Sequence, residues 1–199
     1  MDKKIYATDG KYFLVPVTEE EKDNYMKVMF PESNTPSFYR YVENRELFWK
    51  TIRNLKEKDY SIYDPEGGYC GNIELKHYDT VTPEIGIELL ENQRNKGIAG
   101  RAIKMLAKKY YQESDVIEYF ILRVSSNNPH SQHMIEKLGA EFDCEEETLV
   151  QRSLRLLKEQ MGEDAFPKPD ETYRAEYGLD AEEQEEVVYR YRLMPEEFL

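Results

Sequence analysis

The sequence predicts an α/β fold, with a mixed, mostly antiparallel sheet of about six or seven strands flanked by helices. Three short strand-like runs at 60–64, 69–78 and 82–90 are separated by turn residues, which indicates consecutive strands joined by tight turns. After residue 97, helical and strand-like patterns alternate, as expected where helices pack on a sheet. The 199 residues are 40% hydrophobic, which is enough for one hydrophobic core, so we expect a single domain over 1–199.

The N-terminal elements are predicted from local patterns. The run KYFLVPV at 11–17 indicates a strand, and Thr18 with Glu21 forms a capping-box pattern that predicts a helix to about residue 29. A second, amphipathic helix is expected at 44–59. Its apolar stripe consists of Leu47, Phe48, Ile52 and Leu55.

The second half of the chain continues with alternating elements. Apolar residues that recur every four positions predict a helix at 97–111, and the apolar run at 116–124 is typical of a central strand. A short helix is expected at 128–139, because asparagine and proline open this segment and a glycine closes it. The last strands are expected at 140–150 and 185–194.

Residues 151–184 are expected to form a surface insertion, with a helix at 151–162 followed by a segment rich in proline and acidic residues. The formal net charge of the chain is −13. Residues 141–199 carry 18 acids and 7 bases, a net −11, whereas residues 1–140 carry 22 acids and 20 bases, a net −2. The acidity of the protein therefore belongs to its C-terminal third.

Charge and composition exclude several classes of function. No basic run is long enough to neutralise a row of phosphates, so we expect no nucleic-acid partner, whereas an acidic protein fits cationic or amine-bearing partners. Cys70 and Cys144 lack a second cysteine or histidine at metal-ligand spacing, so we expect both to be reduced and no metal to be bound. Neither a membrane span of ~20 apolar residues nor an apolar signal core is present, so we expect a cytoplasmic protein with no membrane contact.

A polar loop leads directly into the helix predicted at 97–111. Its sequence RNKGIA, residues 94–99, follows a strand and opens a helix, so main-chain N–H groups and the helix dipole converge on a site that can hold a pyrophosphate. Gly97 allows close approach, and Ala99 keeps a small side chain where the phosphates crowd. The alternative is an ordinary turn before an ordinary helix. The charged residues at the rim are Arg94, Lys96 and Arg101.

The loop resembles the acyl-CoA-binding motif R-x-x-G-x-A of the GNAT superfamily of N-acetyltransferases, and a second segment agrees. The run VSSNNPHSQHMIEKLGAEF at 124–142 is similar to the later strand, asparagine and helix of that family, and the resemblance covers about residues 73–142. The sequence of this segment is most similar to that of the branch that acetylates the N-termini of ribosomal proteins. The resemblance implies a GNAT-like fold, acetyl-CoA as co-substrate and acetyl transfer to a primary amine of a small molecule or a protein N-terminus.

The resemblance also implies which residues contact the cofactor. In this family the strand before the loop separates from its neighbour, and its main chain then pairs with the pantetheine arm. That role falls here on Ile87, Leu89 and Leu90, while Asn128 would both cap its helix and reach the arm. The implied cofactor residues are Ile87, Leu89, Leu90, Arg94, Asn95, Lys96, Gly97, Ile98, Ala99, Gly100, Arg101, Asn128 and Ser131.

Catalysis in this family is direct attack of an amine on the thioester, which requires the amine to be neutral. An amine with a pKa near 10.4 is neutral in only about 1 of 2,500 molecules at pH 7, so a carboxylate on the strand before the loop is the expected base. We favour Glu84 over Glu88, because its place in PEIGIEL resembles that of a glutamate that some family members use. Glu74 and His77 are further options. For each of these residues the alternative is a side chain on a solvent-exposed strand face, with no catalytic role.

One position departs from the pattern of the family. Many members carry a tyrosine seven residues after the asparagine, as the acid for the leaving thiolate, whereas this chain has Ile135, so the acid is unassigned and Ser131 is a weak substitute. This departure and the acidic insertion favour the alternative of a non-catalytic acyl-CoA-binding or regulatory module. We expect the acceptor pocket near Tyr39, Tyr41 and Phe48, in a monomer or homodimer.

Overall fold

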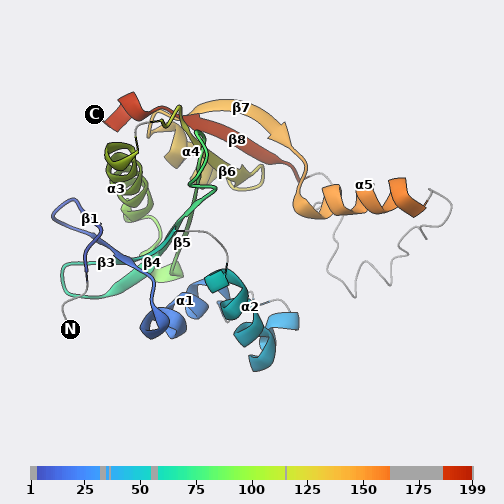
Figure 1. The fold of residues 1–199 in the computed structure, drawn as a ribbon, viewed down its shortest axis with the longest axis horizontal. Helices are drawn as coiled ribbons and strands as arrows, with labels where there is room; N and C mark the ends of the chain where they lie inside the picture. The colour runs from blue at the N-terminus through green and yellow to red at the C-terminus, as the bar shows by residue number, and fades with distance from the viewer. Residues whose placement is uncertain are drawn as a thin grey trace.

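The computed structural model describes residues 4–31, 35, 37–54, 58–114, 116–161 and 186–198. Within these ranges it has one eight-stranded sheet in the order β1-β2-β3-β4-β5-β6-β8-β7, with helices on both faces (Figure 1). Neighbouring strands are antiparallel except β5 and β6, which are parallel. The predicted sheet type is confirmed, with eight strands rather than six or seven. The strands are β1 (Ala7–Thr8), β2 (Phe13–Pro16), β3 (Lys58–Tyr63), β4 (Tyr69–Lys76), β5 (Glu84–Leu89), β6 (Phe120–Ser125), β7 (Glu141–Glu146) and β8 (Val188–Leu193).

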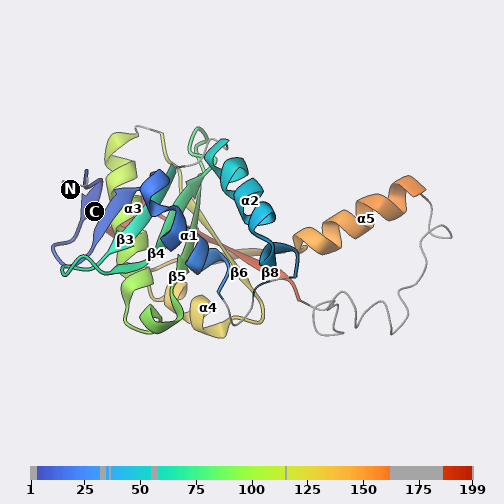
Figure 2. The same ribbon diagram turned by 90° about the horizontal axis from the view of Figure 1, so that it is seen from below.

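The helices divide between the two faces of the sheet (Figures 1 and 2). Helices α1 and α2 cover one face, α3 and α4 cover the other, and α5 extends away from the sheet in both views. The α-helices are α1 (Lys22–Met29), α2 (Val42–Asn54), α3 (Ile98–Glu113), α4 (Pro129–Glu136) and α5 (Leu149–Met161). Short 3-10 helices are η1 (Glu19–Glu21), η3 (Ser37–Arg40), η4 (Glu91–Gln93) and η6 (Pro195–Phe198).

Each face of the sheet has its own hydrophobic core. On the α3 side, alternate residues of the strands pack against the predicted apolar stripe of α3, and Ile62, Ile73 and Leu106 are fully buried there. On the other side, α1 and α2 pack around the buried Trp49 and Tyr25. Because successive side chains of a strand point to opposite faces, the strands supply apolar residues to the α3 side and several polar ones to the α1 side.

The first helix begins differently from the prediction. Thr18 makes no side-chain cap, and η1 precedes α1. The Glu21 side chain, the second member of the predicted capping box, contacts strand β3. It is buried against the sheet, where its carboxylate accepts hydrogen bonds from the hydroxyl groups of Tyr63 and Ser61. The local pattern was overridden by a tertiary contact.

Three further boundaries differ from the prediction. Helix α2 ends earlier than 59, and Lys58 and Asp59 belong to β3. Leu47 is 59% exposed, so the buried face of α2 is defined by Trp49 and Ile52 instead. Leu55 lies outside the described residues. The predicted strand at 116–124 is shortened to β6, because the chain before Phe120 is irregular.

The C-terminal elements form one edge of the sheet. Strand β8 lies between β6 and β7, so the chain leaves the sheet after β7, forms α5 and returns to fill the place beside β6. Helix α5 matches the helix predicted at 151–162 within two residues. The rest of the expected insertion, residues 162–184, lies outside the described residues. Within the described ranges, no helix is both long and apolar enough to cross a membrane.

Candidate active site

Strand β5 is paired on both sides at its start and on one side at its end. It pairs with β4 over its whole length, whereas its register with β6 contains the single pair Glu84 and Ile121. The adjoining contact is a hydrogen bond of 2.9 Å from the Ile121 amide to the Pro83 carbonyl. Because the two parallel strands separate after this point, no strand of the described residues pairs with the second half of β5 on the β6 side, and its main-chain edge there is free of them.

The alternation of main-chain groups shows which residues of β5 point to that edge. The Leu90 amide donates to the Cys70 carbonyl at 3.0 Å, so even-numbered residues direct their main-chain groups to β4. The odd-numbered Ile87 and Leu89 direct theirs to the gap, in agreement with the predicted contact to a pantetheine arm. The Leu90 amide, which the sequence also assigned to this contact, is already used by β4. On that side Gly71 lies so close to Leu89 that a side chain at position 71 would collide with β5.

The loop after β5 has the geometry of an anion site. It contains η4 and then two residues with positive φ, Asn95 at 60° and Gly97 at 74°. The first bond of α3 closes from the Arg101 amide to the Gly97 carbonyl at 3.4 Å, so the amides of residues 98–100 lie in the first turn, where no intrahelical acceptor exists. A Cβ built at Gly97 meets no atom within 4 Å, so the space before the loop is open to a ligand. These features fit a pyrophosphate.

The side chains of this segment divide between the loop surface and the protein interior. Arg94 and Lys96 are exposed at the rim, as are Asn95 and Gly97. Ile98 is buried in the core on the α3 side, so only its main chain can serve a ligand. These residues keep the assignment made from sequence, with the contact of Ile98 limited to its amide.

Two residues of the predicted set have structural contacts of their own. A Cβ at Gly100 would lie 3.3 Å from Leu138, so glycine there allows α3 to pack closely on the segment after α4. The Arg101 guanidinium donates to Asp9 at 2.6 Å and lies over the ring of Tyr12, which directs it toward the β1–β2 hairpin. Ala99 is partly buried beside them.

Helix α4 begins at the same end of the sheet as the loop, because it follows β6, which runs parallel to β5. Asn128 is its N-cap, and its Oδ1 accepts a hydrogen bond from the Ser131 amide at 3.1 Å, which confirms the predicted cap. Asn128 is exposed and its amide nitrogen remains available to a ligand, so the cofactor contact stays a prediction. Ile135 is buried in the core, and no hydroxyl group stands at that position.

The two candidate bases lie on the α1 side of β5 in different surroundings. Glu84 forms an ion pair with Arg123, its second oxygen lies 3.9 Å from Lys76, and its side chain is 14% exposed. Arg123 also donates to Glu146 at 2.6 Å. Glu84 is therefore engaged by two cations at the paired end of the strand. The geometry therefore favours Glu88 over Glu84, and the catalytic assignment remains a prediction.

Glu88 stands at the open end of β5, close to the loop. Its carboxylate makes no hydrogen bond or ion pair with the described residues. Although solvent reaches the side chain, surrounding protein atoms displace part of its hydration, and this raises the pKa of its carboxyl above the usual value. The positive charge of Arg94 opposes that shift, and the negative charge of Glu74 adds to it. A carboxyl with a raised pKa is a better base at neutral pH.

The remaining candidates are less well placed. Glu74 forms an ion pair of 2.7 Å with Lys76, and His77 lies in the turn after β4, at the end of the sheet away from the loop. Tyr39 and Phe48 belong to an aromatic cluster with Phe30, and Tyr41 is exposed. The ring cluster is therefore part of the α1 and α2 layer, and its role in acceptor binding remains a prediction.

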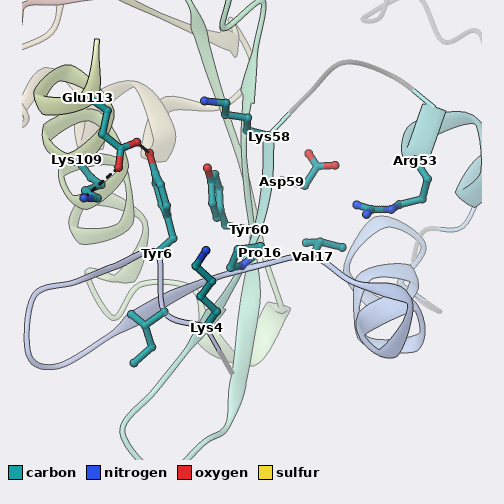
Figure 3. Close-up of a pocket in the computed structure, with 11 residues that line it drawn as sticks. Lys4, Tyr6, Pro16, Val17, Arg53, Lys58, Asp59, Tyr60, Lys109 and Glu113 are labelled. Atoms are coloured by element: carbon teal, nitrogen blue, oxygen red, sulfur yellow. Dashed lines mark hydrogen bonds and ion pairs between the residues drawn. The ribbon is translucent and has the colours of Figure 1, made fainter. Parts of the chain in front are cut away.

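A cavity of about 550 Å³ lies at the far end of α3 from the loop (Figure 3). Its walls include the stacked rings of Tyr6 and Tyr60, 4.4 Å apart, and the Tyr6 hydroxyl donates to Glu113, which also pairs with Lys109. Gly97 and Glu113 are 16 residues apart on this helix, or about 24 Å at 1.5 Å per residue. The predicted cofactor and catalytic residues do not line this cavity, so we do not assign acetyl transfer to it.

Sequence reasoning missed the polar residues that face Glu88 from the neighbouring strands. Asn72 and Ser61 occupy the positions across from it on β4 and β3, and Tyr69 bonds to Asn72. The only signal in the sequence is a polar residue at alternate positions of apolar strands, and the register that joins them cannot be read from that signal. Among the described residues, no three His, Cys, Asp or Glu side chains are arranged to hold a metal ion.

Comparison with known proteins identifies the class of protein to which this fold belongs. A family model for the acetyltransferase (GNAT) domain matches residues 11–141, more than half of the chain, so the protein belongs to this family and is an N-acetyltransferase. Family members use acetyl-CoA as co-substrate. The comparison with curated proteins found no match.

Solved structures with the same fold include spermidine N-acetyltransferases. A variant of the enzyme from Vibrio cholerae aligns with a TM-score of 0.63 and 15% identity, over 96% of this chain and 97% of that one. A structure of the spermidine/spermine enzyme from the same organism in complex with manganese ions has a TM-score of 0.59, with 16% identity over 94% and 95% of the two chains. A dodecameric form has a TM-score of 0.61, with 16% identity over 96% and 98%. At these identities the likeness shows the fold.

Proposed function

We propose that this protein transfers the acetyl group of acetyl-CoA to a primary amine of a cationic small molecule. The observation that carries the proposal is the free edge of β5 at Ile87 and Leu89, which lies between an anion-binding loop and the carboxylate of Glu88. The cofactor residues are those of the loop, the main chain of Ile87 and Leu89, and Asn128. Acetyl-CoA supplies the acetyl group as an activated thioester.

In the proposed mechanism, the loop holds the pyrophosphate and the edge of β5 aligns the pantetheine arm. Glu88 removes one proton from the ammonium group of the acceptor, and the neutral nitrogen then attacks the thioester carbon from the α1 side. The carbon–sulfur bond breaks, the attacking nitrogen gives its second proton to water, and water returns a proton to the thiolate, because Ile135 provides none. CoA thiolate is a sufficiently stable leaving group for this route.

The charge of the α1 side supports a cationic acceptor. Four strand carboxylates belong to this side of β3, β4 and β5, at positions 59, 74, 84 and 88, against two cations, Lys76 and Arg123, which pair with Glu74 and Glu84. The solved neighbours act on spermidine, so a polyamine is the first acceptor to test. The free N-terminus of a protein, the acceptor in the ribosomal-protein branch, is the alternative. We further propose a single cytoplasmic domain over 1–199 that acts as a monomer or homodimer.

A second function is favoured by one observation. Ile135 leaves the leaving group without a protein acid, which a non-catalytic acyl-CoA-binding module would not need. A thiol-release assay separates the two functions, with purified protein, acetyl-CoA and a panel of spermidine, simple amines, amino sugars and peptides. We expect thiol release with spermidine or another cationic amine. Binding of acetyl-CoA by calorimetry without thiol release for any acceptor would support the module.

A further inference from the structure

The cavity at the far end of α3 lies where β2 ends and β3 begins. Its volume of about 550 Å³ is within the roughly 300–1,000 Å³ that is usual for small-molecule sites. Part of its wall is apolar and includes Ile5 and Val17, beside the stacked rings of Tyr6 and Tyr60. The proposed acetyl transfer uses none of these residues, so the cavity has no function assigned to it.

Most of the charged residues that line this cavity are cations. Four cations stand against two carboxylates, a net charge of +2, in a chain whose formal net charge is −13. The cations are Lys4, Arg53, Lys58 and Lys109, and the carboxylates are those of Asp59 and Glu113. A surplus of positive charge in a concave wall attracts anions, even where the rest of the protein is acidic.

Three of the four cations are not neutralised by a contact. Lys109 forms an ion pair of 3.0 Å with Glu113. Lys4, Arg53 and Lys58 make no ion pair with the described residues. In Figure 3, Arg53 reaches in from α2, and Lys4 extends toward the tyrosine rings. An anion in the cavity would therefore meet cationic groups that are not already paired with a described carboxylate.

Two of these cations are held in place by aromatic rings. The Lys58 ammonium lies over the rings of Tyr78 and Tyr110, 4.7 and 4.6 Å from their centroids. The Arg53 guanidinium lies 5.7 Å from the centroid of the Trp49 ring. A ring contact restricts the side chain and leaves its N–H groups able to donate to an anion. Less conformational freedom is then lost when a ligand binds.

We propose that this cavity binds a small organic anion, with an aromatic body that carries a phosphate or a carboxylate group. The apolar part of the wall would take the aromatic body, and Lys4, Arg53 and Lys58 would take the anionic group. An inorganic ion would leave the apolar wall in contact with water, so an organic ligand fits better. The site is about 24 Å along α3 from the loop, and the proposal does not depend on acetyl transfer.

Calorimetric titration with phenyl phosphate and with benzoate tests the proposal. The full chain is first saturated with CoA, so that the loop before α3 is not open to the probe. We expect one-to-one binding with a Kd below about 1 mM for the tighter of the two anions. Inorganic phosphate, which lacks the ring, and benzyl alcohol, which lacks the charge, should each bind at least about tenfold more weakly. The ratio of the two Kd values distinguishes a phosphate ligand from a carboxylate ligand.

The residues of the site are tested by Lys4→Glu and Arg53→Gln, with Lys104→Glu as the matched control. Lys104 is an exposed lysine of α3 that does not line the cavity. Each cavity variant should raise the Kd at least about fivefold, because a charge-assisted hydrogen bond is lost. The control should stay within about twofold at roughly 150 mM salt, where more distant charges are screened. Lys4 is exposed, so Lys4→Glu carries the test if Arg53→Gln does not fold.

Four outcomes would overturn the inference. They are no binding of either anion at millimolar concentration, an unchanged Kd in both cavity variants, an equal loss in Lys104→Glu, and binding of benzyl alcohol as tight as that of the anions. The last would show an apolar cavity without an anion site. Because the titration contains no acceptor amine and does not measure thiol release, a failure of the proposed function would leave its result unchanged.

Discussion

The two ends of β5 carry the same residue type on the same face but differ in every other respect. At its start the strand is paired on both sides, and Glu84 is neutralised by Arg123. At its end the described residues leave the β6 side unpaired and give Glu88 no counter-ion in contact, and the pKa of its carboxyl is raised. In the function proposed above, the separation of the two strands and the ion pair with Arg123, rather than the identity of the residue, decide which carboxylate is available for chemistry.

The largest effect is expected on CoA affinity, from a substitution that blocks the loop at the open end of β5. Gly97→Glu adds a side chain and a negative charge where main-chain N–H groups converge, so CoA affinity should fall by more than about a hundredfold. Calorimetry with CoA measures it. Gly97→Ala is the control, because its Cβ enters open space and only the positive φ opposes it, at roughly 1 kcal/mol. Undiminished binding by Gly97→Glu would mean that the loop holds no phosphate.

The second prediction tests the two carboxylates directly. Glu88→Gln should lower kcat/KM for the amine by about a hundredfold, and Glu84→Gln by less than about threefold, with CoA affinity unchanged in both. Steady-state thiol release measures both variants. The reverse order would restore the assignment favoured by the sequence and would show that the paired end is the reactive one.

The pH dependence of these variants follows from the raised pKa of Glu88. In the wild type, kcat/KM should decline as pH falls through a value above 4.5, because protonation removes the base. In Glu88→Gln this limb should disappear, whereas Glu84→Gln should keep it. An unchanged limb in Glu88→Gln would assign the titration to another group.

A smaller effect is expected from salt. The acidic α1 side should attract a cationic acceptor, and this attraction is screened over roughly 8–10 Å at physiological ionic strength. The KM for spermidine should therefore rise a few-fold between about 50 and 500 mM salt, while a neutral amine of similar size shows little change. An anionic or neutral compound as the best acceptor would contradict the charge argument.

The smallest expected effect is on the unfolding free energy, through the ion pairs at the paired end of β5. Hydrogen bonds from Arg123 hold the pKa of Glu146 below its usual value of 4.5. A lowered pKa in the folded state stabilises the protein above about pH 4.5, and this contribution is lost as pH falls through the folded value. Glu146→Gln should therefore lower the unfolding free energy by about 1 kcal/mol at pH 7, as a partly exposed pair allows, and by less at pH 4. Urea unfolding at both pH values measures this, and an equal loss at both would exclude the ion pair as the cause.

The sequence by itself determined the class of fold, the order of the elements and the position of the loop that opens α3. These features depend on residues close together in the chain: the turn residues between β3, β4 and β5, the four-residue period of α3, and the glycine before it. The local sequence is sufficient to predict these features, because a left-handed backbone conformation and a helix N-terminus depend only on residues adjacent in the chain. The cap at Asn128 was predicted for the same reason.

Only the tertiary structure decided the chemistry on the sheet. Period-two alternation placed Glu84 and Glu88 on one face, but the ion pair to Arg123, 39 residues away, separates their roles. The same holds for Asn72, which lies opposite Glu88 because of the register between β4 and β5. It also holds for Glu21, which was expected in a helix cap and instead accepts a hydrogen bond from Tyr63. Register and burial arise from pairings between distant segments, and the free energy of a polar group depends on those neighbours more than on its own identity.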